Sequence, residues 1–178
     1  MEVFEAVQTV LATRSYRPEP LPEESVRKIL EAGRLTGSSM NKQPWHFIAV
    51  EDREDLRKIG GMASTGPYIA EAGLAVAVVI KDTQYSVSDA SRAIQSMILT
   101  AWEAGIHSNW VGFFGLEEIK AYLDIPDELD LLAVVPFGYS DRPSGKGKKD
   151  RKPFSEVVHQ GRFSQPFEEP ASEQHRTK

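Results

Sequence analysis

Residues 74–80 read Leu-Ala-Val-Ala-Val-Val-Ile, an apolar run without a charged or turn-forming residue. A run of this length that is rich in β-branched residues is typical of a strand with both faces buried. Three other segments are rich in aromatic and β-branched residues, which predicts further strands: Trp45–Val50, Trp110–Phe114 and Leu131–Gly138. The sequence therefore predicts one sheet with residues 74–80 at its centre.

Helical patterns precede and separate these strands. In the longest, apolar residues recur at helical spacing from Ala90 to Ala101, and Gly105 follows in a position that commonly ends a helix. Shorter helices are predicted over residues 3 to about 13, from Pro22 through Leu30, and over Glu51–Ile59, Leu116–Leu123 and Phe154–Val158. This order of elements indicates an α+β or α/β protein in which helices cover one sheet.

The composition is that of an ordinary globular protein. The chain has 178 residues, 40% of them hydrophobic and 26% charged, with a formal net charge of -5. This length favours a single domain, predicted over residues 1–160, followed by a polar tail over residues 161–178. The acidic balance argues against a general nucleic-acid-binding protein, and the apolar runs are too short to span a membrane. Residues 1–10 lack a basic stretch, so no signal peptide is predicted and we expect a cytoplasmic protein.

Several common catalytic motifs are missing from the sequence. It has no cysteine, which excludes disulfides, thiolate metal sites and cysteine nucleophiles. The glycine motif of dinucleotide-binding folds and the serine motif of hydrolases are also absent. The glycines and lysines of residues 144–149 do not have the spacing of a phosphate-binding loop. We expect no metal, because no pair has metal-ligand spacing among the four histidines His46, His107, His159 and His175.

Three polar segments have chemistry that suits a flat, phosphorylated ligand. Arg14-Ser15-Tyr16-Arg17 places two guanidiniums and a hydroxyl within four residues, a set that suits a phosphate. In the loop of residues 38–45, the amide of Asn41 can both donate and accept, and so can bind the edge of a pyrimidine ring. Residues 148–153 form a basic segment that can bind a phosphate. Taken singly, each segment is more typical of a solvated helix end, a turn or a soluble loop.

The order and spacing of these segments resemble the nitroreductase family of FMN-dependent oxidoreductases. The most specific part is Asn-x-Gln-Pro-Trp-x-Phe at residues 41–47, which follows Glu-Ala-Gly-Arg-Leu at residues 31–35. Arg-Ser-x-Arg at residues 14–17 and Arg-x-Pro at residues 151–153 stand in the family's order. The resemblance covers residues 3 to 158. It implies an α+β fold in three layers, with helices on both sides of a mixed, mainly antiparallel sheet.

The resemblance also implies FMN as the cofactor, held at the interface of a homodimer by residues of both chains. The resemblance implies that Arg14, Ser15 and Arg17 contact the phosphate and ribityl chain, and that Lys149 and Arg151 contact the phosphate. It implies that Asn41 faces the pyrimidine ring and that Ser39 lies close to the ring or ribityl chain. Val111 and Gly112 match the positions beside flavin N5 and the C4 carbonyl. A backbone N–H near Val111 would donate to N5, and Gly112 would let the backbone approach the ring closely. No side chain is expected to be catalytic, because flavin N5 is the reactive centre.

The implied reaction is a ping-pong transfer of a hydride from NADH or NADPH, through flavin N5, to a nitroaromatic, a quinone or a similar acceptor. Two alternatives remain open: a flavin-binding or nucleotide-sensing module without turnover, and an enzyme of the same fold that performs flavin fragmentation or dehalogenation. The sequence departs from the family in two respects. Thr13 stands where the family often has a basic residue, which predicts a looser grip on the phosphate. Residues 60–73 and 81–88 leave little room for the helices that cover the flavin in larger members, which predicts an open substrate pocket.

Overall fold

The structure is a computed structural model that describes residues 1–112, 115–141 and 149–167. Contacts between residues divide the chain into two compact units, Met1–Gly147 and Lys148–Lys178. The first unit contains the sheet and all helices but one. Among its described residues, the second contains one short helix, α6, over Phe154–Val157. The predicted division into residues 1–160 and a tail of residues 161–178 stays a prediction.

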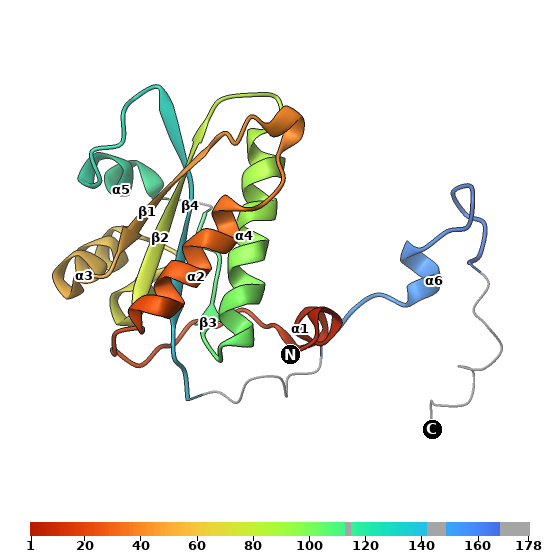
Figure 1. Ribbon diagram of the computed structural model, residues 1–178, viewed down its shortest axis with the longest axis horizontal. Helices are drawn as coiled ribbons and strands as arrows, with labels where there is room; N and C mark the ends of the chain where they lie inside the picture. The colour runs from red at the N-terminus through yellow and green to blue at the C-terminus, as the bar shows by residue number, and fades with distance from the viewer. Residues whose placement is uncertain (113–114, 142–148, 168–178) are drawn as a thin grey trace. The chain divides into compact units, whose positions relative to one another are not determined.

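Four antiparallel strands form the sheet of the first unit (Figure 1). They lie in the order β1, β2, β4, β3, and their bounds are Trp45–Val50 for β1, Leu74–Lys81 for β2, Leu129–Gly138 for β4 and His107–Ser108 for β3. β2 is fully buried up to Ile80 because β1 and β4 pair with its two edges and helices cover both of its faces. The predicted central position of residues 74–80 is confirmed.

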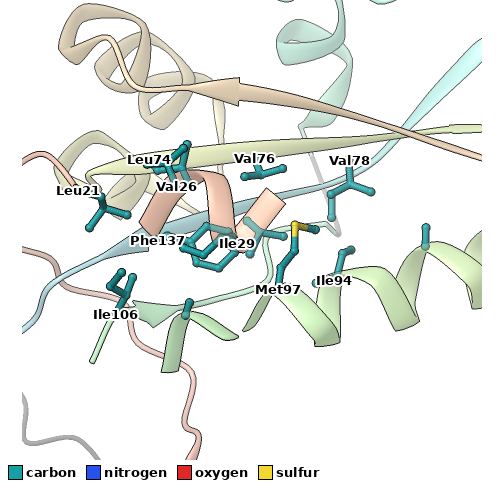
Figure 2. Packing of buried hydrophobic residues seen from close by; sticks show 14 of the residues in the cluster. Leu21, Val26, Ile29, Leu74, Val76, Val78, Ile94, Met97, Ile106 and Phe137 are labelled. Atoms are coloured by element: carbon teal, nitrogen blue, oxygen red, sulfur yellow. The ribbon is translucent and has the colours of Figure 1, made fainter. Parts of the chain in front are cut away.

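Alternate residues of β2 point into two separate cores, as the period of two in a strand requires. Leu74, Val76, Val78 and Ile80 pack on the side of helices α2 (Glu23–Arg34) and α4 (Ser86–Glu103), with Phe137 of β4 opposite Leu74 at one end of this cluster (Figure 2). Ala75, Ala77 and Val79 pack on the other side with residues of α3 (Arg53–Met62) and α5 (Leu116–Tyr122). The smaller side chains on this second face leave room for Leu56 and Ile59 of α3, which are completely buried. The unit is therefore a three-layer α+β fold, and the expected fold class is confirmed.

The helices follow the apolar spacing of the sequence, with local signals at several ends. Asp52 caps α3 by accepting hydrogen bonds from the N–H groups of Glu54 and Asp55. Gly105, with a φ of 74°, follows the end of α4. The helices of the first unit are α1 (Val3–Thr9), α2 (Glu23–Arg34), η1 (Ser39–Asn41), α3 (Arg53–Met62), η2 (Pro67–Glu71), α4 (Ser86–Glu103) and α5 (Leu116–Tyr122). No described helix is long and apolar enough to cross a membrane.

Two of the predicted boundaries that differ from the structure concern the same seam. The first helix ends at Thr9 rather than near Thr13, because Ala12 forms a parallel bridge to Ser108 and the Thr13 N–H donates to the Ser108 carbonyl at 2.9 Å. This bridge is the parallel part of the sheet. The strand predicted over Trp110–Phe114 is instead β3 at His107–Ser108 with a single further bridge at Val111; residues 113 and 114 lie outside the described residues.

Candidate functional site

The segment after α1 lies along β3 and presents Arg14, Ser15 and Arg17 at the surface. Backbone hydrogen bonds fix it at both ends: the Thr13 N–H donates to Ser108, and the Arg17 N–H donates to the Tyr139 carbonyl at 2.9 Å. The side chains of Thr13 and Tyr16 are buried, whereas those of Arg14, Ser15 and Arg17 are exposed. The guanidiniums and the hydroxyl that the sequence predicts for a phosphate are therefore accessible from solvent, and their role stays a prediction.

Buried polar side chains on the inner side of this segment hold it in place. The Thr13 hydroxyl lies 3.0 Å from Nδ1 of His107, and the Tyr16 hydroxyl donates to the Thr13 carbonyl at 2.7 Å. Burial, with a smaller contribution from Tyr68, raises the pKa of Tyr16 far above its usual value and keeps the phenol neutral. Thr13 thus packs inward, and only the exposed residues that follow it are accessible to a ligand from this segment's surface.

Arg17 is already surrounded by groups of its own chain. Its guanidinium pairs with Glu19 at 2.8 Å and with Asp141 at 3.8 Å, and it lies 5.7 Å from the centre of the Tyr139 ring. About half of the side chain is exposed, so these pairs are solvent-screened and exchangeable. A phosphate would compete with Glu19 for the same guanidinium.

A cavity of about 240 Å³ lies next to this segment. Val10, Leu11 and Ala12 line one side and Ser108, Asn109 and Trp110 line another, while Gln95 and Ile98 of α4 close it. Its walls are mostly apolar, with the polar groups of Ser108, Asn109 and Gln95 among them. Arg14 follows two residues after Ala12, so a cationic surface adjoins a largely apolar hollow, which is the combination that a phosphorylated ring requires.

Val111 and Gly112 lie beyond this cavity, and their backbone is partly engaged. The Val111 N–H donates to the Val134 carbonyl at 3.0 Å, and the Val111 carbonyl accepts the Val134 N–H at 2.8 Å. The Val111 N–H is therefore used by the sheet, and a donor to a ring would have to come from a neighbouring residue. At Gly112, the space of a Cβ is taken by the Trp110 indole of the same chain. The glycine permits this close approach of Trp110.

Ser39 and Asn41 lie on a second loop, between α2 and β1. The Ser39 N–H and hydroxyl both donate to the Asp89 carboxylate at 3.0 Å. Met40, Asn41 and Gln43 have positive φ values of 53°, 54° and 47°, and the Gln43 side-chain amide donates to Oδ1 of Asn41 at 3.1 Å. This tight turn leaves Asn41 exposed.

The two loops lie at opposite ends of α4. The Ser39 loop contacts Asp89 in the first turn of the helix, whereas the segment with Arg14 meets its last turn through His107 and Trp102, whose rings are 4.9 Å apart (Figure 1). Asp89 and Trp102 are separated by about 20 Å along the axis, at about 1.5 Å per residue. Within one chain, Asn41 and Arg14 are therefore far from each other.

Lys149 and Arg151 belong to the second unit, so their place at a site with Arg14 stays a prediction. Burial, and to a smaller extent Arg151, lowers the pKa of Lys149. The Arg151 guanidinium donates to the Asp150 carbonyl at 2.7 Å. Lys148, the first residue of the predicted basic segment, and His175 lie outside the described residues.

No pattern in the sequence predicts three residues of the candidate site. Asp89 and His107 take part through buried side chains, and the partly buried Tyr68 accepts a hydrogen bond from the Asn109 amide at 2.5 Å. None stands in a motif, and a single aspartate within a helical pattern is usually a solvated one. The described part of the chain contains no cluster of three or more histidine or acidic residues that could hold a metal.

Comparison with known proteins identifies the family of this chain. The model of the nitroreductase family matches residues 11–81 and 76–139, which include the whole sheet and the segment from Arg14 to Asn41. The chain belongs to the nitroreductase family. Membership of this family confirms the resemblance that the motifs at residues 14–17 and 41–47 indicate.

Two archaeal nitroreductases are similar in sequence. One from Methanothermobacter thermautotrophicus is 34% identical over 148 residues, which is 78% of each chain. Another from Archaeoglobus fulgidus is 34% identical over 167 residues, covering 88% of this chain and 91% of the relative. Both carry the name "Putative NADH dehydrogenase/NAD(P)H nitroreductase".

Solved nitroreductase structures share the fold. A protein from Bacteroides thetaiotaomicron superimposes with a TM-score of 0.82 at 23% identity, covering 90% of this chain and 98% of that one. An FMN-dependent nitroreductase from Clostridium difficile superimposes with a TM-score of 0.80 at 24% identity, covering 90% and 99%. These structures show that most of this chain shares their fold.

Proposed function

We propose that this nitroreductase is an FMN-dependent oxidoreductase that takes electrons from NADH or NADPH and passes them to a nitroaromatic, a quinone or a similar acceptor. Family membership supports the reaction class. The observation that carries the cofactor is the cavity of about 240 Å³ beside the exposed Arg14, Ser15 and Arg17. It adjoins a cationic surface that suits a phosphate, and its mostly apolar walls suit a flat ring.

The donor set of this chain fits FMN. Arg14 and Arg17 would bind the phosphate with forked, charged donors, and Ser15 would add a neutral hydroxyl. Bound FMN would supply the redox chemistry, by accepting a hydride from the nicotinamide and giving electrons to the acceptor. The chain's own residues would bind and orient the ligand: Trp110 and Ile98 line the cavity and would pack against the ring, and Asn41 would hold its polar edge.

A homodimer would complete this site. The exposed Asn41 and Arg14 lie at opposite ends of α4, and two-fold packing with antiparallel copies of α4 would bring the Asn41 end of one chain to the Arg14 end of the other. α1, which packs beside the last turns of α4, leaves three apolar side chains exposed that such a partner would cover, Val3, Phe4 and Val7. These observations support a site made from two chains.

The absorption spectrum of the protein tests the cofactor first. The purified protein is incubated with FMN, desalted and measured in the visible range. We expect a retained flavin spectrum that NADH or NADPH bleaches under anaerobic conditions and that a quinone restores. A folded, colourless protein would overturn the proposal, and retained flavin that neither nicotinamide reduces would indicate a binding module.

Mixed dimers test the shared site. Arg17→Ala and Asn41→Ala chains with different tags are co-expressed, and the heterodimer is isolated through both tags. If each site uses Arg17 of one chain and Asn41 of the other, the heterodimer has one intact site and should retain about half of the wild-type flavin, more than either variant homodimer. Flavin content no higher than in the homodimers would mean that one chain supplies both residues.

The second unit is proposed to add phosphate contacts through Lys149 and Arg151. Arg151→Ala should raise the FMN dissociation constant by about tenfold, the effect of one charge-assisted hydrogen bond. Arg162→Ala is the matched control, because Arg162 is a second exposed arginine of the same unit. If Arg151→Ala and Arg162→Ala bind FMN with equal affinity, Arg151 does not contact the phosphate.

A further inference from the structure

Asp89 has an unusual environment for an acidic residue. Among the residues that the structure describes, it is the one Asp, Glu, Lys or Arg that is buried, with 1% of its surface exposed. It lies in the first turn of α4, which packs beside the sheet. A buried carboxylate is costly unless hydrogen bonds and a counter-charge compensate it. Its partners therefore indicate its role.

Those partners come from two elements. The Ser39 N–H donates to one carboxylate oxygen and the Ser39 hydroxyl donates to the other, each at 3.0 Å. Arg92, one turn further along α4, pairs with the same carboxylate. Burial raises the pKa of Asp89, but the hydrogen bonds from Ser39 and the pairing with Arg92 outweigh it, so the net pKa is lowered and the group is ionised at neutral pH.

The loop that Asp89 holds has a strained backbone. Met40, Asn41 and Gln43 all have a positive φ, a conformation that is costly for residues other than glycine. Such residues persist where the surroundings fix them. The Ser38 hydroxyl accepts the Gln43 N–H at 2.9 Å and closes the turn locally. Asp89 anchors the turn to the body of the protein through Ser39.

We propose that Asp89 is the positioning residue of the flavin site: its ionised carboxylate fixes Ser39 and thereby holds Asn41 in the left-handed turn that presents its amide to the ring. This inference rests on the proposed function. Asp89 acts through Ser39 and does not touch the ligand. Because Arg92 neutralises the carboxylate, the anchor adds little negative charge near a flavin, whose reduced form is anionic.

The test combines flavin binding with hydrogen exchange. Asp89→Asn keeps the shape of the side chain but removes its charge and one acceptor. We expect the FMN dissociation constant to rise by about tenfold, and amide hydrogens of residues 39–43 to exchange faster in the flavin-free protein. Ser39→Ala, which removes one of the two Ser39 bonds, should show the same pattern to a smaller extent and serves if Asp89→Asn fails to fold. Glu118→Gln, which removes an exposed acid on α5, is the control.

A double-mutant cycle separates positioning from general stability. If Asp89 acts through Asn41, Asp89→Asn should raise the dissociation constant by less than about twofold in the Asn41→Ala background. Provided that the wild type binds FMN, either of two results would overturn the inference. The effects of Asp89→Asn and Asn41→Ala on binding could be fully additive, or Asp89→Asn could leave the FMN affinity unchanged. Wild-type protein that binds no FMN would overturn the proposed function and this role together, so the two failures are distinguishable.

Discussion

Nδ1 of His107 lies 3.0 Å from the hydroxyl of Thr13, inside the seam where the segment after α1 meets β3. Both residues are buried, and the His107 ring also meets Trp102 edge-on. Trp102 in turn donates from its indole N–H to the Thr9 hydroxyl at 2.9 Å. This polar network joins α1, α4 and β3, and it supports the surface from which Arg14 projects.

The seam should make stability depend on pH. Burial lowers the pKa of His107, so the unfolded chain binds a proton more readily than the folded protein. The contribution of His107 to the free energy of unfolding is therefore fully present above the pKa of histidine in the unfolded chain, about 6.5. As the pH falls through this value, the contribution decreases by at most about 1.4 kcal/mol per pH unit. Urea unfolding between pH 8 and about pH 5 measures this slope. His107→Gln should flatten it, whereas His46→Gln, on an exposed residue of β1, should not; equal slopes in all three proteins would contradict the prediction.

Two adjacent glycines of α3 should respond oppositely to alanine. A Cβ on the buried Gly60 would lie 2.7 Å from the Ala70 backbone nitrogen, so Gly60→Ala forces α3 and η2 apart and should cost about 1–3 kcal/mol of unfolding free energy. Gly61 has open space around its Cβ position, and Gly61→Ala should be neutral or stabilise by up to about 1 kcal/mol. Thermal and urea unfolding compare the two variants. Equal effects would mean that the α3–η2 contact is less tight than the structure has it.

The exposed face of α1 should be needed for dimerisation. Phe4 is 71% exposed, and burying such a side chain in an interface contributes about 1.5–3 kcal/mol. A two-fold dimer buries Phe4 of both chains, about 3–6 kcal/mol together, so Phe4→Ser should raise the dimer dissociation constant by about a hundredfold or more, measured by sedimentation over a range of concentrations. Phe4→Leu keeps an apolar side chain and should dimerise nearly as the wild type does. A wild-type monomer that holds FMN would disprove the shared site.

Removing the competitor of a phosphate should strengthen flavin binding. Glu19 pairs with Arg17 at 2.8 Å, and in the proposed site FMN would have to displace it to reach the guanidinium. Exposed pairs contribute up to about 1 kcal/mol, so Glu19→Gln should lower the FMN dissociation constant by at most about fivefold. Titration of flavin fluorescence measures it, with Glu118→Gln as the control for lost charge. In an Arg17→Ala background the gain should disappear; a gain that persists there would show that Glu19 acts on the ligand directly.

Much of the fold can be predicted from the sequence, because its strands and helices depend on local patterns of residues. The apolar run of residues 74–80 predicts a buried central strand, and the spacing from Ala90 to Ala101 predicts the long helix; both are confirmed. The boundary of the first helix is wrong because a bridge from Ala12 to a residue far along the chain ends the helical path early. Pairing over such a distance leaves no periodicity in the sequence.

The sequence by itself determined the family, the buried strand and the polar segments that are proposed to bind the flavin, since residue type and spacing along the chain are local properties. Only the tertiary structure decided how these segments meet. It set Arg14 and Asn41 at opposite ends of α4, engaged the Val111 N–H in the sheet, and buried Asp89 against Ser39. These relationships depend on which surfaces pack together, and packing is decided by the shape and burial of the whole unit rather than by any one segment.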